Sequence, residues 1–178
     1  MHLSLAVVIA CLIMCVSLIK IIIYFYKYQK EYHFLFKYSE NGSEQAYKIL
    51  QKFQNIYCSK KECMIIISQK IDTPLTTGII KKVIILPNID YSFKELYYIL
   101  LHEYTHVVKN DLIKKLCLDI FMLMFWWIPC NEFIVKDITQ FMEIRCDRLL
   151  LKYDTNADTV DYMETLLYAL KSKKVSDE

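Results

Sequence analysis

The first part of the chain carries an apolar run that limits what it can form. No charged side chain occurs from Leu3 to Ile19, and the apolar character continues past Lys20 to Tyr26. A helix needs about 20 residues to cross the hydrocarbon core of a bilayer, so this run is long enough to span a membrane. We therefore expect a transmembrane anchor with a juxtamembrane helix in residues 1–30 and a second domain in residues 31–178.

Charges on the two sides of this run indicate its orientation. Only His2 and the chain terminus precede it, whereas several lysines follow it: Lys20, Lys27, Lys30 and Lys37. Basic residues favour the cytoplasmic side, so we expect a single-pass protein of the cell membrane with its N-terminus outside and the later domain in the cytoplasm. A cleaved signal peptide would normally begin with a basic residue and have a shorter apolar core. A lipoprotein site around Cys11 is disfavoured because the apolar run continues well beyond it.

Composition limits the remaining function classes. The chain has 178 residues, of which 55% are hydrophobic and only two are glycine, a profile typical of a helical, membrane-associated protein. A net charge of +2 is too small to indicate direct binding to nucleic acid. Seven cysteines are an odd number, and Cys11 and Cys15 lie inside the apolar run, so we expect reduced thiols. Cys58 and Cys63 resemble half of a zinc knuckle, but no matching second pair follows.

The later domain alternates helical and strand patterns. Apolar residues recur at helical spacing from Ala46 to Tyr57, and Ser92 with Glu95 forms a capping box for a helix to about Lys109. Residues 63–68 and 78–86 are short and rich in isoleucine and valine, which predicts two strands. The expected fold class is α+β and mostly helical, with a small β-sheet. The apolar stretch 116–130 is short for a span, so it is either an interfacial or re-entrant segment or a buried core helix.

The capped helix carries an H-E-x-x-H pattern at His102, Glu103 and His106. Residues four apart lie on one face of a helix, so both imidazoles can bind one metal ion. Glu103 points to the adjacent side, where it can take a proton from water activated by the metal. Because Lys109 and Leu112 replace the glycine and histidine of the extended metzincin pattern, that class is excluded.

A third metal ligand must then be a carboxylate. Glu143 and Asp147 lie four residues apart in a largely apolar helix, so they share one side of it. We expect Glu143 to bind zinc and Asp147 to accept the second N–H of a ligand imidazole. The alternative is that these acids form salt bridges with Arg145 or Arg148.

Three motifs in order resemble a known family. They are PLTTGIIKKVIILP at residues 74–87, LLHEYTHVVKNDL at residues 100–112, and EIRCD at residues 143–147, with an aromatic stretch before the last. Over residues 73–151 the chain resembles the gluzincin domain of the BlaR/MecR-type antirepressor metallopeptidases. The resemblance implies zinc on His102, His106 and Glu143, with Glu103 as the catalytic base. Asp111 also falls on a recurrent acid of the family, although capping of the next helix explains it equally well.

The function expected from these features is that of a membrane-anchored zinc endopeptidase. Its substrate would be a protein at the cytoplasmic face, such as a transcriptional repressor in a signalling pathway, and a separate sensor subunit is a further expected partner. The receptors of the family carry several spanning helices and a sensor domain that binds β-lactam, so we expect a short form and do not carry antibiotic sensing over. Two alternatives stay open: a non-catalytic, membrane-tethered regulatory subunit with a structural zinc, and a peptidase that processes a small membrane peptide.

Overall fold

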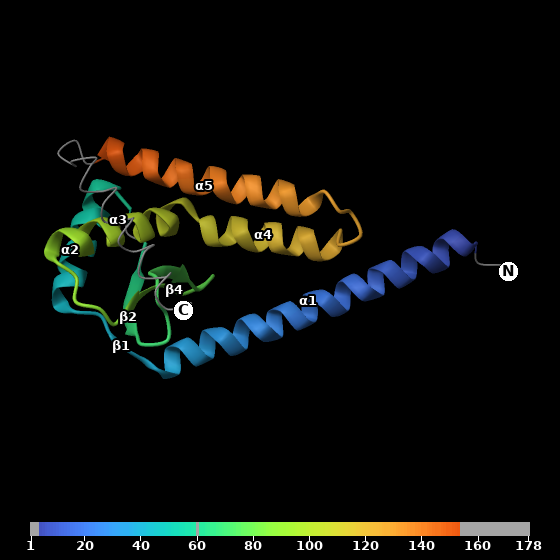
Figure 1. Ribbon diagram of the computed structural model, residues 1–178, viewed down its shortest axis with the longest axis horizontal. Coiled ribbons are helices and arrows are strands. Elements are labelled where there is room, and N and C mark those ends of the chain that lie inside the picture. The colour runs from blue at the N-terminus through green and yellow to red at the C-terminus, as the bar shows by residue number, and fades with distance from the viewer. Residues whose placement is uncertain (1–3, 60, 154–178) are drawn as a thin grey trace, which may run out of the picture.

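The computed structural model describes residues 4–59 and 61–153, and the rest of the predicted peptidase domain, residues 154–178, lies outside them. The described chain is mostly helical with one small sheet, which confirms the predicted fold class (Figure 1). In chain order the elements are α1 (Leu5–Lys37), β1 (Ser39–Asn41), α2 (Glu44–Ile56), β2 (Cys63–Ser68), β3 (Leu75–Thr77), β4 (Lys82–Pro87), α3 (Phe93–Lys109), α4 (Asp111–Met124) and α5 (Asn131–Tyr153).

Helix α1 is the apolar run of the sequence continued into the juxtamembrane segment. Its 33 residues give a length of about 50 Å at roughly 1.5 Å per residue. Among the described residues it is the one helix long and apolar enough to cross a membrane. Its N-terminal part projects beyond the rest of the molecule (Figure 1). Apolar side chains along the helix, such as Leu5, Leu12 and Ile22, are more than half exposed.

The sheet has four strands in the order β1-β2-β4-β3. Strands β2 and β4 are parallel, with Cys63 opposite Lys82 and Ser68 opposite Pro87, and the two outer strands are antiparallel to their neighbours. The predicted strand at residues 63–68 is confirmed.

The strand predicted at residues 78–86 is confirmed over residues 82–86, which belong to β4, whereas residues 78–81 form the turn between β3 and β4. Gly78 has φ of +85°, and a Cβ at this position would lie 1.9 Å from the carbonyl oxygen of Lys81. Ile79 and Ile80 of the turn resemble the isoleucines of β4, which conceals the turn in the sequence. A further short strand, β3, precedes the turn, so β4 lies inside the sheet and β3 forms one of its two edges.

One face of the sheet packs against α2 and α3. Ile65, Ile84 and Leu86 are buried there with the inner faces of both helices. The capping box is present as predicted: the Ser92 hydroxyl accepts from the backbone N–H of Glu95, and the Glu95 carboxylate accepts from that of Ser92. Burial and the cap together hold the central part of α3 rigidly over the sheet. On the opposite face, Leu35 and Phe36 from the end of α1 pack against the sheet.

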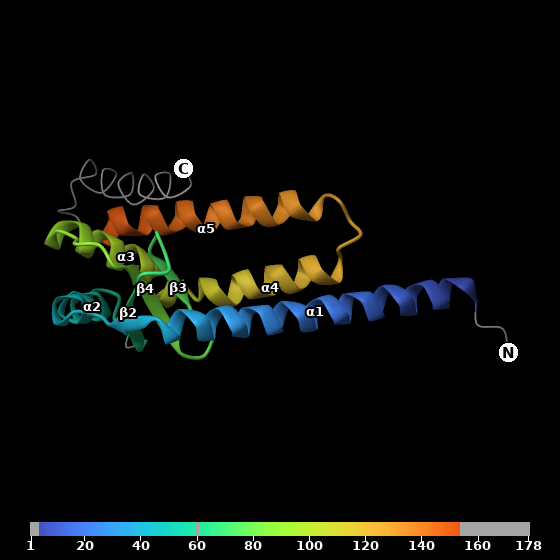
Figure 2. The same ribbon diagram turned by 60° about the horizontal axis from the view of Figure 1, so that its bottom comes forward.

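Helices α4 and α5 form a hairpin beside α1 (Figure 2). The apolar stretch 116–130 is the second half of α4 with the connection to α5. Phe121, Trp126 and Trp127 are about 40% exposed, which contradicts the interpretation as a buried core helix. Helix α5 then returns along α3 and places residue 143 beside the H-E-x-x-H helix.

Candidate metal centre

His102 and His106 lie one turn apart on the inner face of α3. Their Nε2 atoms are 3.3 Å apart, and the two rings meet edge to face. His106 is only 6% exposed. The fully buried Leu101, Tyr104 and Val107 fix the helix that carries both rings.

Glu143 of α5 completes a triangle of donor atoms. Its Oε2 atom lies 3.6 Å from Nε2 of His102 and 3.3 Å from Nε2 of His106. Tetrahedral zinc with bonds of about 2.0–2.2 Å requires donors separated by roughly 3.3–3.6 Å. The three donor atoms therefore fit one zinc ion without rearrangement.

Two further acids contact the imidazole nitrogens that face away from the donor triangle. Nδ1 of His106 lies 2.9 Å from Oδ2 of Asp111, and Nδ1 of His102 lies 3.4 Å from Oδ1 of Asp147. A carboxylate on Nδ1 fixes the tautomer that leaves Nε2 free to bind metal. Asp111 begins α4, but its buried carboxylate makes these contacts and no side-chain cap bond forms at that helix start, so the capping interpretation is wrong.

Arg145 pairs with a different acid from the two named in the salt-bridge alternative. Arg145 Nη2 donates to Asp111 rather than to Glu143, and Lys114 Nζ donates to the same carboxylate at 3.0 Å. Glu143 instead pairs through Oε1 with Lys115 at 3.1 Å, which leaves Oε2 directed at the histidines. The ion pairs thus hold the acids in place without removing the donor triangle.

The charge balance of the cluster favours a cation. Burial lowers the pKa of His106, but hydrogen bonds with Asp111, Cys146 and Glu143 outweigh it and raise this pKa to about 11. The pKa of His102 is also raised. Burial acts in the opposite direction, and the hydrogen bond with Asp147 contributes most to the rise. Hydrogen bonds with the two histidines hold the pKa of Glu143 well below its usual range. The negative charge that raises the histidine pKa values also attracts a divalent metal ion.

Glu103 is held by the edge strand. The Thr76 hydroxyl of β3 lies 2.6 Å from Oε2 of Glu103 and donates to it. Glu103 is 8% exposed. A small cavity of about 240 Å³ adjoins the centre. It is lined by residues of β3 and of the metal centre, including Leu75, Thr76, Glu103, His106 and Glu143.

Cys146 is a neighbour of the centre for which the sequence predicted no role. It is fully buried, and its Sγ atom lies 3.9 Å from Nδ1 of His102. Donor atoms of His102, His106 and Cys146 all lie within 4.8 Å of one another. Thiolates bind zinc well, so the site offers a second candidate for the third ligand. Its position in the EIRCD motif, one turn from Glu143, was the available signal.

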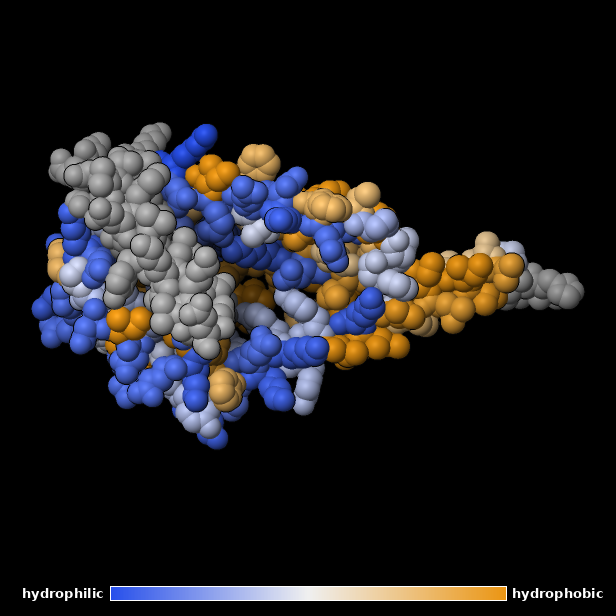
Figure 3. Space-filling model, viewed as in Figure 1, coloured by the Kyte–Doolittle hydropathy of each residue, from blue (hydrophilic) through white to orange (hydrophobic). Residues whose placement is uncertain are grey.

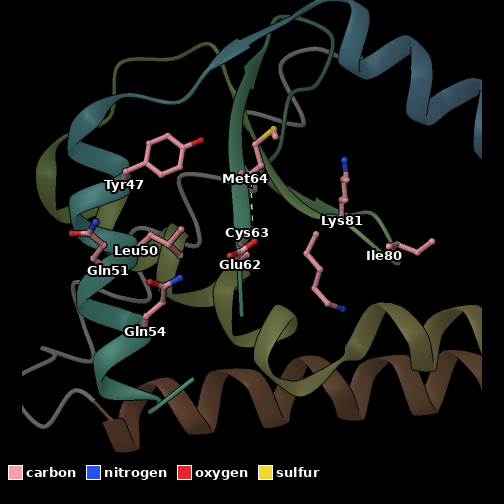
Figure 4. A pocket seen from close by; sticks show the side chains of 10 residues that line it. Tyr47, Leu50, Gln51, Gln54, Glu62, Cys63, Met64, Ile80 and Lys81 are labelled. Carbon is pink, nitrogen blue, oxygen red and sulfur yellow. Dashed lines mark hydrogen bonds between the residues drawn. The ribbon is translucent and has the colours of Figure 1, made fainter. Parts of the chain in front are cut away.

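A larger cavity of about 630 Å³ lies away from the centre, between α2, β2 and the turn before β4. Figure 4 shows Tyr47, Leu50 and Gln54 extending from α2 toward Cys63 on β2. Burial raises the pKa of the Cys63 thiol to about 12, which makes it a poor metal ligand. All seven cysteines are free, as the sequence predicted.

Two histidines of H-E-x-x-H and a glutamate from a later helix form the kind of donor set that zinc peptidases use. A family model described as BlaR1 peptidase M56 matches residues 1–178. The chain therefore belongs to the BlaR1 peptidase M56 family, which confirms the resemblance seen in the motifs.

Curated relatives agree with this assignment. The chain is 32% identical over 135 residues to a methicillin resistance mecR1 protein of Staphylococcus aureus, covering 73% of this chain and 23% of that protein. It is 31% identical over 102 residues to the regulatory protein BlaR1 of Bacillus licheniformis, covering 56% of this chain and 17% of that protein. The chain thus spans less than a quarter of the length of these relatives.

Proposed function

We propose that this chain is a membrane-anchored zinc endopeptidase that cleaves a protein substrate at the cytoplasmic face. The observation that carries the proposal is the donor triangle of His102, His106 and Glu143, with the buried Glu103 carboxylate on the same helix. A purely structural zinc site needs no such base.

His102, His106 and Glu143 would hold the zinc ion. When bound, zinc supplies a Lewis acid that acidifies water and polarises a peptide carbonyl. Asp111 and Asp147 keep the imidazole rings oriented toward the donor triangle. Arg145 and Lys114 hold Asp111 in turn.

Glu103 would move the proton during hydrolysis. As general base it takes a proton from the attacking water, and as general acid it passes that proton to the leaving amine. The hydrogen bond from Thr76 fixes one carboxylate oxygen, so the other remains available for the proton.

The substrate would bind as an extended strand along β3. Strand β4 is paired on both sides, whereas β3 forms the edge of the sheet on this side. Leu75 and Thr76 of this edge line the cavity that reaches Glu103 and Glu143. Main-chain pairing to a sheet edge binds peptides with little dependence on sequence, which suits an endopeptidase.

The signalling role follows from the family. Relatives are named as methicillin resistance and regulatory proteins, so we propose that the substrate is a regulatory protein such as a transcriptional repressor. The chain would act with a separate sensor subunit and would not bind nucleic acid itself. The lysines after the apolar run support an orientation with the N-terminus outside and the peptidase in the cytoplasm.

The first prediction tests the role of the base. Glu103→Gln should abolish cleavage of the candidate repressor, since an amide cannot accept the proton, and should leave one zinc ion bound per chain. Zinc is measured by atomic absorption and cleavage by gel mobility. Glu44→Gln, an exposed glutamate of α2, is the matched control and should retain activity. Full activity of the Glu103→Gln protein would refute the enzymatic proposal.

A second candidate function is the non-catalytic regulatory subunit with a structural zinc. The observation that favours it is Cys146, whose sulfur lies close enough to supply a fourth ligand and close the site. In that case the Glu103→Gln chain would keep its cellular effect.

A further inference from the structure

The connection between α4 and α5 presents an apolar surface to solvent. We define the hairpin tip as residues 121–134. Seven of its large hydrophobic side chains are about 40% exposed or more: Phe121, Met124, Trp126, Trp127, Ile128, Phe133 and Ile134. Figure 3 shows hydrophobic side chains at this end of the hairpin and along the projecting part of α1.

Three contacts hold the hairpin against α1. The Ser17 hydroxyl donates to the backbone oxygen of Met124 at 3.1 Å, and the Tyr24 hydroxyl donates to Asp119 at 2.7 Å. Lys20 Nζ lies 4.2 Å above the ring of Trp126, a cation–π contact. These contacts hold the tip beside residues 17–24 of α1.

This part of α1 corresponds to the boundary of a bilayer. If the hydrocarbon core covers residues 4–23, a length of about 29 Å at roughly 1.5 Å per residue, Lys20 lies about 5 Å and Ser17 about 9 Å inside its inner edge. Tryptophan concentrates at this depth, and a lysine there extends its ammonium group toward the headgroups. Asp119 meets Tyr24 just outside the same edge.

We propose that the hairpin tip is seated in the cytoplasmic leaflet, with lipid as its partner, at a depth of about 5–10 Å. This inference rests on the spanning role of α1 proposed above. Continuity with α1 is what identifies lipid as the occupant, since the tip and the apolar face of α1 meet at one level.

The position of the tip in the bilayer determines how far the metal centre lies from the hydrocarbon core. Helix α4 has 14 residues, so about 20 Å separates Met124 from Asp111, the residue that contacts His106. Figure 2 shows α4 running alongside α1, so most of this length is directed away from the bilayer. The centre would stand about 10 Å outside the hydrocarbon. The substrate is then a soluble or juxtamembrane segment, and a peptide within the bilayer would not reach the site.

The chain carries its own probe for this proposal, because its only two tryptophans are Trp126 and Trp127 of the tip. The full chain would be reconstituted in phosphatidylcholine vesicles containing lipids brominated either near the headgroup or near the end of the acyl chain. We expect the shallow bromines to quench tryptophan fluorescence roughly twofold, more than the deep bromines do, and aqueous acrylamide to quench weakly.

Each other result overturns the proposal. Strong acrylamide quenching without a bromine effect would place the tip in water, and no quenching by either agent would place it against protein, such as a second copy. Stronger quenching by the deep bromines would place it near the bilayer centre. Vesicle flotation after alkaline washing tests the anchor separately. A chain that is washed off the vesicles would show that α1 does not span the bilayer, whatever the position of the tip. Activity enters none of these measurements.

Discussion

The hydrogen bond between Thr76 and Glu103 joins the expected base to the strand expected to bind substrate. Thr76→Val removes the hydroxyl while keeping the shape of the side chain. We predict that kcat falls about tenfold or more, because the carboxylate loses its fixed orientation, and that zinc content is unchanged. Thr76→Ser should restore most of the activity. A valine variant whose kcat and pH profile match the parent protein would show that Thr76 does not position Glu103.

Glu143 and Cys146 compete as the third donor beside the two histidines. Glu143 Oε2 faces both Nε2 atoms, whereas the Cys146 sulfur lies 3.9 Å from Nδ1 of His102, the nitrogen that faces Asp147. We therefore predict that Glu143→Ala loses zinc affinity by tenfold or more and that Cys146→Ala retains the metal. Isothermal titration with zinc measures both. The reverse ranking would assign the ligand to Cys146.

At the scale of elements, the turn between β3 and β4 determines where the sheet edge lies. Gly78→Ala would bring a Cβ into the Lys81 carbonyl at a positive φ, so we predict destabilisation by about 1–3 kcal/mol and a matching loss of activity. Urea denaturation measures the first effect. Ile80→Ala lies in the same turn with a 93% exposed side chain, so this control should behave as the parent protein does. Equal stabilities for the two variants would contradict this role of the turn.

Local signals in the sequence predicted α3 well, because a capping box and helical periodicity depend only on residues within a turn or two. The reversal at Gly78 was missed because Ile79 and Ile80 of the turn resemble the β-branched residues of β4. The sequence identified Asp111 as an acid that recurs in the family but did not give its role. That role depends on contacts with Arg145 and His106, which belong to other elements. Cys146 was missed because nothing local separates a thiol in the core from one beside a metal.

At the scale of the whole molecule, the metal would join α3 to α5 by ligands from both helices. Removing zinc should lower the thermal unfolding midpoint, and at a zinc concentration of 100 times Kd the lost stability is about 2.7 kcal/mol. We predict that zinc restores the midpoint and that magnesium does not, because the donors are mainly nitrogen. Calorimetry of the chain in detergent before and after chelation tests this. An unchanged midpoint would mean that zinc does not join the helices.

The most direct test of the account is X-ray absorption at the zinc edge of the purified, metal-loaded chain. We predict two imidazole nitrogens and carboxylate oxygen at about 2.0–2.2 Å, with no sulfur scatterer. A sulfur at about 2.3 Å would show that Cys146 is a ligand and would contradict the proposed donor set.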